Sequence, residues 1–233
     1  MAGTRDWAGD CAAVIPCFNE SARIAGVVSG VRQCLPAVIV VDDGSTDLTA
    51  ERARRAGAEV IRCDANRGKG AALRRGWRRA RERGFAWVAM LDGDGQHAPG
   101  ELSRFFEHAE RTGARLVVGN RMDQPGRMPL VRRWVNRWMS RRLSRLTGTL
   151  LPDSQCGYRL AHLETLLALP LRANRFEIES AMLVAFLTAG QKVAFVPVSS
   201  RYEHPASKIN PLTDTWRWWR WWRTQTAVAA DWR

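Results

Sequence analysis

The chain reads Asp92-Gly93-Asp94-Gly95-Gln96-His97 directly after an apolar run that extends from Phe85 to Leu91. The run predicts a buried strand, and because side chains alternate along an extended chain, Asp92 and Asp94 can point the same way. Paired oxygen ligands at a strand end suit Mg²⁺ or Mn²⁺, which proteins often bind through one or two carboxylates together with substrate phosphates. The same residues also suit a surface turn of Asp and Gly, so the rest of the chain has to decide.

Predicted strands and helices alternate along the first half of the chain. The strands are expected at residues 11–16, 37–41, 59–62, 85–91 and 115–118, and the helices at 21–35, 46–57, 70–84 and 99–112. This alternation predicts an α/β fold with a doubly wound, mostly parallel sheet. Ligands of such sheets lie beyond the carboxyl ends of the strands. The polar loops at 16–20, 42–47 and 92–97 are therefore expected to converge on one crevice.

The second half of the chain has a different pattern. Helices are expected at 128–146, 165–171 and 177–189, a polar loop at 153–159 and a strand at 192–198. From residue 213 onward Trp and Arg dominate the sequence. Neither a repeat nor a low-complexity linker separates the halves, which predicts a single domain, 1–233, with a C-terminal lobe.

The composition favours a globular protein with anionic partners. The 233 residues suffice for one α/β domain with a buried core, and the net charge of +13 favours nucleotides, phospholipid surfaces or nucleic acid. The five cysteines form no Cys-x-x-Cys pair, so reduced thiols in a cytoplasmic protein are expected. The N-terminus lacks the apolar core of a signal peptide, and the longest apolar stretch, 181–189, is too short to cross a bilayer. Any membrane contact is therefore expected to be peripheral.

A series of short motifs follows in order along the chain. They occupy residues 14–20, 40–47, 66–70, 92–97, 119–121, 153–159 and 207–210. Each motif is weak alone, but the whole set in this order resembles the family 2 glycosyltransferases, and more narrowly the synthases of dolichyl- or polyprenyl-phosphate sugars. The resemblance covers about residues 12–214. It implies the GT-A fold, a Rossmann-like α/β architecture, and a sugar donor activated by a nucleoside diphosphate.

The resemblance also implies a set of donor-binding residues. They would be Pro16, Phe18, Glu20, Val41, Asp43, Lys69, Gly93 and, near the C-terminus, Lys208. A carboxylate such as Asp43 accepts hydrogen bonds from hydroxyl or ring N–H groups. Lys69 follows a glycine at the start of a predicted helix, where anions bind well. Alternatively, Glu20 is a helix-start acid favoured by the dipole, Asp43 belongs to an Asp-Gly-Ser turn, and Lys69 is a solvated lysine.

The divalent cation, Mg²⁺ or Mn²⁺, is assigned by the resemblance to Asp92, Asp94 and Gln96. The metal would bridge the donor diphosphate and neutralise the charge that builds on the leaving nucleotide. His97 is expected to support this site rather than to bind the metal.

The acceptor decides which other groups the site needs. Family 2 enzymes typically invert the anomeric carbon by direct displacement, so a hydroxyl acceptor needs a general base, whereas a lipid phosphate needs cationic positioning. By the resemblance Arg121, Arg132 and Asn136 would face the acceptor phosphate, with Arg133 as an alternative to Arg132. Asp153 would be either the base for a hydroxyl acceptor or an anchor that holds its own loop by hydrogen bonds.

Two amphipathic stretches favour contact with a lipid surface. If 128–146 is helical, about half of its circumference is apolar, and this face consists of Val131, Trp134, Val135, Trp138, Met139, Leu143 and Leu146. In the tail, one side is predicted to carry Trp218, Trp219, Trp221 and Trp222 and the other Arg217, Arg220 and Arg223, with Trp216 outside the pattern. Trp prefers the headgroup zone and Arg suits anionic lipids. Both helices could instead pack on the sheet or on a partner chain.

These patterns together predict an inverting, metal-dependent hexosyltransferase that moves a sugar from a nucleotide donor to a polyprenyl phosphate on the cytoplasmic face of a membrane. Its parts would be a nucleotide-sugar half at 11–120, an acceptor half at 121–212 and a membrane-docking tail at 213–233, with a membrane-spanning protein as a further candidate partner. One alternative is a soluble family 2 enzyme acting on a glycan, a protein or a small hydroxyl compound. Another is a basic nucleic-acid-binding module, but the metal-binding pattern speaks against it, so no nucleic acid partner is expected.

Overall fold

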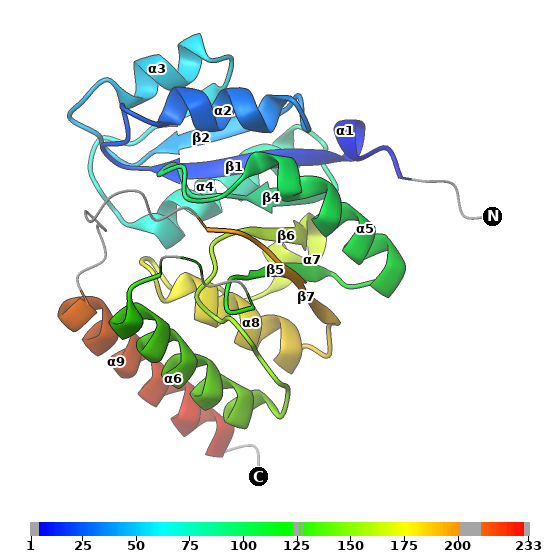
Figure 1. Ribbon diagram of the computed structural model, residues 1–233, viewed down its shortest axis with the longest axis vertical. Coiled ribbons are helices and arrows are strands. Elements are labelled where there is room, and N and C mark those ends of the chain that lie inside the picture. The colour runs from blue at the N-terminus through cyan, green and yellow to red at the C-terminus, as the bar shows by residue number, and fades with distance from the viewer. Residues whose placement is uncertain (1–4, 124–125, 127, 201–210, 231–233) are drawn as a thin grey trace.

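The computed structural model describes residues 5–123, 126, 128–200 and 211–230, and within the last range it describes the side chains of 215–224. These residues form a seven-stranded sheet (Figure 1). Its strands are β1 (Cys11–Cys17), β2 (Val38–Asp42), β3 (Glu59–Arg62), β4 (Trp87–Met90), β5 (Leu116–Asn120), β6 (Arg159–His162) and β7 (Val193–Pro197). Their order is β3-β2-β1-β4-β6-β5-β7, and all described pairs are parallel except those of β6. The predicted α/β fold with a mostly parallel sheet is confirmed.

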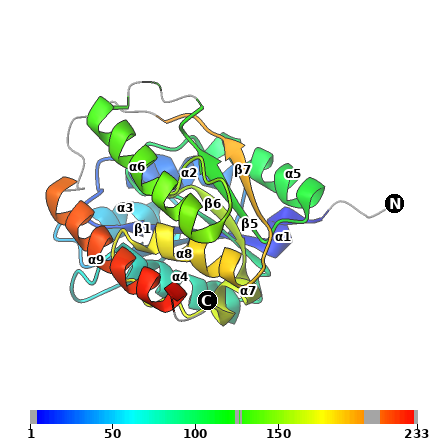
Figure 2. The same ribbon diagram turned by 90° about the horizontal axis from the view of Figure 1, so that it is seen from below.

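Helices cover this sheet, and some of them lie beyond one end of it. They are α1 (Trp7–Asp10), α2 (Ile24–Arg32), α3 (Thr49–Arg55), α4 (Lys69–Glu82), α5 (Leu102–Thr112, after the 3₁₀ turn Pro99–Glu101), α6 (Leu130–Thr147), α7 (Leu163–Ala168), α8 (Ile178–Thr188) and α9 (Pro211–Ala230). Helix α4 packs across β1 and β2, and α5 lies against β5 and β7. Helices α6 and α9 lie side by side in both views (Figures 1 and 2), and Figure 1 shows them at the end of the molecule away from α2 and α3.

The central strands are buried along their whole length. β1, β2, β4 and β5 are almost entirely apolar, as expected where both faces of a sheet are covered. The polar residues of β2 and β5 are their last ones, Asp42 and Asn120. Polar groups therefore gather at the carboxyl edge of the sheet, where the loops that follow the strands meet.

Strand β6 begins at the last residue of the loop expected at 153–159 and continues through residues for which the sequence analysis expected no element. Arg159 and His162 flank only two apolar residues, so the segment has no recognisable strand pattern. Because β6 runs antiparallel to β4, with Arg159 opposite Met90, the loop that precedes it lies at the carboxyl edge of the sheet. The helix expected at 165–171 ends at Ala168, since a residue that precedes a proline, here Pro170, disfavours the helical conformation.

The apolar face of α6 is divided between the core and the surface. Met139 and Leu143 are buried, whereas Val131 and Trp134, nearer the start of the helix, are both 68% exposed. The predicted apolar face therefore packs on the core near the end of the helix and is exposed to solvent near its start.

The predicted arrangement of the tryptophans on α9 is wrong at Trp219 and holds for Trp218, Trp221 and Trp222, which cluster. Trp218 is 2% exposed and stacks on Trp222 with a centroid distance of 5.6 Å, and Trp221 also packs against the core. Trp219 instead faces outward together with Trp216. Trp218 turns inward because it packs against Trp138 of α6 and donates a hydrogen bond to Ser180 of α8. None of the helices within the described ranges has the length and apolar character of a membrane span.

Candidate active site

A cleft of about 1060 Å³ opens at the carboxyl edge of the sheet. Its walls come from the loops after β1, β2 and β4, from the start of α4, and from α6 and the segment before α8. Most of the residues predicted from the sequence line it: Pro16, Phe18, Glu20, Asp43, Lys69, Asp92, Gly93, Asp94, Gln96 and Arg132. The three polar loops thus converge as the strand order requires.

Asp43 shapes the part of this cleft where the sequence predicts donor binding. Its carboxylate accepts hydrogen bonds from the backbone N–H groups of Arg67 and Gly68, at 2.9 and 2.7 Å. Gly68 has a φ of +97°, and a Cβ there would lie 2.5 Å from the carbonyl oxygen of Asn174, so glycine is required. Val41 differs from the prediction, because it is fully buried and does not line the cleft. The structure therefore does not bring its side chain to the donor.

Lys69, the first residue of α4, is held between two carboxylates. Its Nζ lies 2.5 Å from Asp92 Oδ1 and 2.5 Å from Glu179 Oε1. Burial alone would lower the pKa of Lys69, but the charges of Asp92 and Glu179 outweigh it and raise this pKa above its usual range. Lys69 is therefore a paired, permanently charged group, and the alternative of a solvated lysine is wrong.

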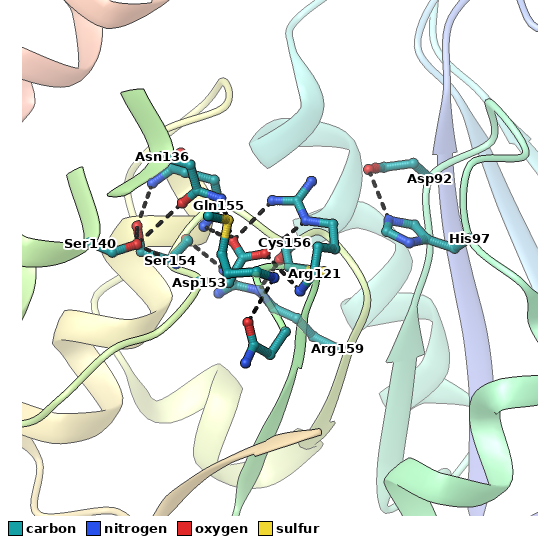
Figure 3. Close-up of polar contacts among 12 residues, drawn as sticks. Asp92, His97, Arg121, Asn136, Ser140, Asp153, Ser154, Gln155, Cys156 and Arg159 are labelled. Atoms are coloured by element: carbon teal, nitrogen blue, oxygen red, sulfur yellow. Dashed lines mark hydrogen bonds and ion pairs between the residues drawn. The ribbon is translucent and has the colours of Figure 1, made fainter. Parts of the chain in front are cut away.

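Asp92 and Asp94 stand in different electrostatic environments. Burial raises the pKa of Asp92, but Lys69 and His97 more than offset this and hold it far below its usual range. His97 Nε2 lies 3.8 Å from Asp92 Oδ2 (Figure 3). Burial and the negative charge of Asp92 raise the pKa of Asp94, whose Oδ1 accepts a hydrogen bond of 3.0 Å from the backbone of Gln96. The two carboxylates repel one another across the cleft wall.

This donor set fits a divalent cation, because a cation would remove the repulsion that raises the pKa of Asp94. Asp92, Asp94 and the amide of Gln96 line the cleft together. Within the described residues no group of three His, Cys, Asp or Glu side chains is arranged to hold a metal. The cation would therefore share its coordination between these residues and substrate phosphates, as Mg²⁺ often does.

Asp153 is the centre of a buried polar cluster beside the cleft (Figure 3). Arg121 donates to it from Nε at 2.8 Å and from a terminal nitrogen at 3.0 Å, and Asn136 Nδ2 donates at 2.9 Å. Although burial raises the pKa of Asp153, the charge and hydrogen bonds of Arg121 and the amide of Asn136 lower it to about 2. A carboxylate with so low a pKa is a poor proton acceptor. The structure thus favours the loop-anchor interpretation of Asp153 over the general base.

The predicted acceptor residues are only partly brought together. Arg121 and Asn136 are both 4% exposed and turned toward Asp153, and neither lines the cleft. Arg132 does line it, whereas the Nε atom of Arg133 is buried. The placement favours Arg132 over Arg133 for contact with a substrate. Lys208 lies outside the described residues.

The loop between Asp153 and β6 reaches Asp92 and Lys69 at Gly157. A Cβ on Gly157 would lie 2.6 Å from Asp92 Oδ2 and 2.7 Å from Lys69 Nζ, so a larger residue there would displace the Lys69–Asp92 ion pair. Glu179 completes this corner, and the sequence analysis did not assign it a role there. The sequence signal that could have identified Glu179 is a carboxylate at the start of a largely apolar helix.

Two relatives and a family model match the chain in sequence. Residues 12–166 match the model of glycosyl transferase family 2. Undecaprenyl-phosphate mannosyltransferase of Micrococcus luteus is 32% identical over 201 residues, which cover 80% of this chain and 81% of that protein. UDP-N-acetylglucosamine--dolichyl-phosphate N-acetylglucosaminyltransferase of Methanococcus voltae is 29% identical over 81% of this chain and 84% of that protein.

The fold resembles that of glucosyl-3-phosphoglycerate synthase from Mycobacterium tuberculosis, whose structure was solved with Mn²⁺, UDP and glucosyl-3-phosphoglycerate. The TM-score is 0.72 at 22% identity, over 94% of this chain and 79% of that one. This likeness concerns the fold and agrees with the expected GT-A architecture. The family match extends over well more than half of the chain and confirms the resemblance inferred from the motifs. The chain belongs to glycosyl transferase family 2 and is a transferase.

Proposed function

We propose that the chain transfers a sugar from a nucleoside diphosphate sugar to a polyprenyl phosphate, with inversion at the anomeric carbon. The observation that carries the choice of acceptor is the state of Asp153. Because Arg121 and Asn136 hold this carboxylate buried and ionised, it is not available to deprotonate a hydroxyl. A phosphate acceptor is already an anion and needs no base. The names of the two sequence relatives support the same acceptor class.

In the proposed reaction an oxygen of the lipid phosphate attacks the anomeric carbon, and the bond from that carbon to the nucleoside diphosphate breaks. The leaving group departs with the bonding electron pair, so no proton has to be moved. Arg132, which lines the cleft, would position the attacking phosphate through charge-assisted hydrogen bonds. Pro16, Phe18 and Asp43 would hold the nucleoside.

A divalent cation, Mg²⁺ or Mn²⁺, would neutralise the charge of the departing diphosphate when bound by Asp92, Asp94 and Gln96. Lys69 would keep Asp92 ionised and oriented for this task through its ion pair. Glu179 would in turn hold Lys69. The repulsion between the two aspartates and their shared place in the cleft wall support this assignment.

We further propose that α6 and α9 dock on the cytoplasmic face of a membrane. The exposed apolar side chains of the described region include Leu130, Val131 and Trp134 on α6 and Trp216 and Trp219 on α9. Arg220 and Arg223 lie over the two exposed indoles of α9, with distances of 5.2 and 4.9 Å to the ring centroids. Indole rings at the headgroup level beside guanidinium groups suit an anionic lipid surface.

The test is transfer of radiolabelled sugar from GDP-mannose, UDP-glucose or UDP-N-acetylglucosamine to polyprenyl phosphate, with Mn²⁺ or Mg²⁺ and with a chelator. We expect a lipid product that mild acid cleaves, which is absent with chelator and absent with the corresponding polyprenol as acceptor. Transfer to a free hydroxyl acceptor instead, with none to the lipid phosphate from any donor, would overturn the proposal.

A further inference from the structure

Helix α9 is joined by hydrogen bonds through α8 to the loop 153–158, which we call the acceptor loop after its proposed role. The indole N–H of Trp218 donates to Ser180 Oγ at 2.8 Å. Gln155 Nε2 donates to the same oxygen at 2.9 Å. Trp218 and Ser180 are both buried, so water cannot replace either donor without rearrangement. The Ser180 hydroxyl therefore accepts one hydrogen bond from α9 and one from the loop.

From Gln155 the connection continues to the buried carboxylate. The backbone N–H of Gln155 donates to Asp153 Oδ1 at 3.0 Å, and its side chain donates to Ser154 Oγ at 2.9 Å. Ser140 Oγ, on α6, in turn donates to Ser154 Oγ and accepts from the Ser154 backbone, at 3.1 and 2.9 Å. Figure 3 shows these groups gathered around Asp153 and Arg121. The loop is thus held by side chains from α6 and α8, and through α8 by α9.

The start of α8 is a firm anchor for this connection. Arg159 donates from its guanidinium to the carbonyl oxygen of Glu179 at 2.6 Å, and to the carbonyls of Ser154 and Cys156 at 3.1 and 2.8 Å. The Glu179 side chain holds Lys69. Ser180 directly follows Glu179, whose carbonyl oxygen is held by Arg159 and whose side chain is held by Lys69. The backbone at Ser180 is therefore fixed in place.

We infer that Trp218 is a positioning residue for the acceptor, which acts by holding Ser180 and Gln155 so that the loop 153–158 keeps Asp153 and Arg121 in place. The inference rests on the proposed function, since it assumes that this loop borders the acceptor. Trp218 also packs against Trp138 and Trp222, with centroid distances of 5.4 and 5.6 Å. Its role in the network therefore has to be separated from simple packing.

Two variants distinguish the hydrogen bond from packing. Trp218→Phe keeps an aromatic ring and removes the N–H donor, and Ser180→Ala removes the hydroxyl that accepts from both Trp218 and Gln155. The matched control is Trp221→Phe, because Trp221 packs on the same cluster, 6.3 Å from Trp218, and its indole makes no hydrogen bond to a described residue. Hydrogen exchange of the Ser154 and Gln155 amides is measured in the substrate-free protein. We expect exchange about fivefold faster or more in Trp218→Phe and Ser180→Ala, and unchanged exchange in the control.

The second measurement is steady-state transfer with polyprenyl phosphate varied at saturating donor, and with the donor varied at saturating lipid. We expect Trp218→Phe to raise the KM for the lipid about fivefold and to leave the KM for the donor unchanged. The Trp218→Phe/Ser180→Ala double variant should show the same lipid KM as Ser180→Ala alone, because Ser180→Ala already removes the acceptor of the Trp218 indole. Unchanged amide exchange, an equal effect in the control, or faster exchange with an unchanged lipid KM would each overturn the inference. Faster exchange in a protein that transfers sugar to no lipid phosphate would support the coupling and refute the proposed function.

Discussion

Two acidic loops meet at the same edge of the sheet, but their carboxylates lie in opposite environments, one exposed to a cleft and the other buried. After β4, Asp92 and Asp94 line an open cleft and repel one another. Before β6, Asp153 is fully buried and neutralised by a bidentate Arg121. The comparison teaches that the surroundings of a carboxylate, rather than its residue type, assign it to cation binding or to scaffolding.

The largest effect is expected from Asp94→Asn, which removes one of the two repelling carboxylates. We expect transfer to fall about 10³-fold or more, because several kcal/mol of charge stabilisation is lost. The melting temperature should hold or rise, since the repulsion with Asp92 disappears. Initial rates at varied Mn²⁺ and thermal unfolding measure both. Asp64→Asn, at an exposed position outside the cleft, is the control, and wild-type turnover in Asp94→Asn would show that the loop is only a turn.

Asp153→Asn should act on stability first. It leaves the buried guanidinium of Arg121 without its counter-charge, so we expect a loss of about 3–5 kcal/mol in the free energy of unfolding. Urea denaturation of this variant beside Asp64→Asn gives the value. An unfolding free energy equal to that of the wild type, combined with lost turnover on a hydroxyl acceptor, would restore Asp153 as a general base and break the contrast between the loops.

The pH dependence of stability sharpens the same contrast. Since the pKa of Asp153 is lowered from 3.8 to about 2 by Arg121, its contribution is complete above the unfolded value and is lost as the pH falls toward 2. This contribution corresponds to about 2–3 kcal/mol. We expect the difference in unfolding free energy between wild type and Asp153→Asn to shrink by that amount between pH 5 and pH 2. A difference that stays constant over this range would contradict the assigned ion pair.

The smallest effect is expected at the surface beyond the acceptor loop. Trp216→Ala with Trp219→Ala removes two exposed indoles, so binding to anionic phospholipid vesicles should weaken about tenfold or more while the melting temperature stays unchanged. Vesicle co-sedimentation measures the binding. Leu48→Ala, which removes an exposed apolar side chain before α3, is the matched control. Equal vesicle binding by all three proteins would contradict docking through α9.

The sequence predicted well which loops line the cleft, because their polar groups lie at or just after the ends of buried strands. Pro16 lies near the end of β1, Asp43 and Asp92 follow β2 and β4, and Lys69 begins α4. The topology of a parallel sheet brings such strand ends and helix starts together. Val41 is the exception, since a residue within a covered strand points into the core. Local pattern was enough wherever the position along a strand decided the environment.

The surroundings of Asp153 were predicted less well, because contacts between distant segments decide them. The strand β6 has too few apolar residues to be recognised, yet pairing with β4 and β5 places its loop against Asp92. The inward turn of Trp218 likewise depends on Ser180, which is 38 positions away. A helical pattern identifies an apolar face but not the neighbour that covers it.

What the sequence by itself determined is the family, the mostly parallel sheet and the convergence of the Asp92 and Asp43 loops, because strand patterns and their terminal residues are local. The tertiary structure alone decided that Asp153 is locked by Arg121, 32 positions away, and that Lys69 lies between Asp92 and Glu179. The physical reason is that the charge state of a buried group depends on the partners that folding brings to it, and those partners come from separate elements of the chain.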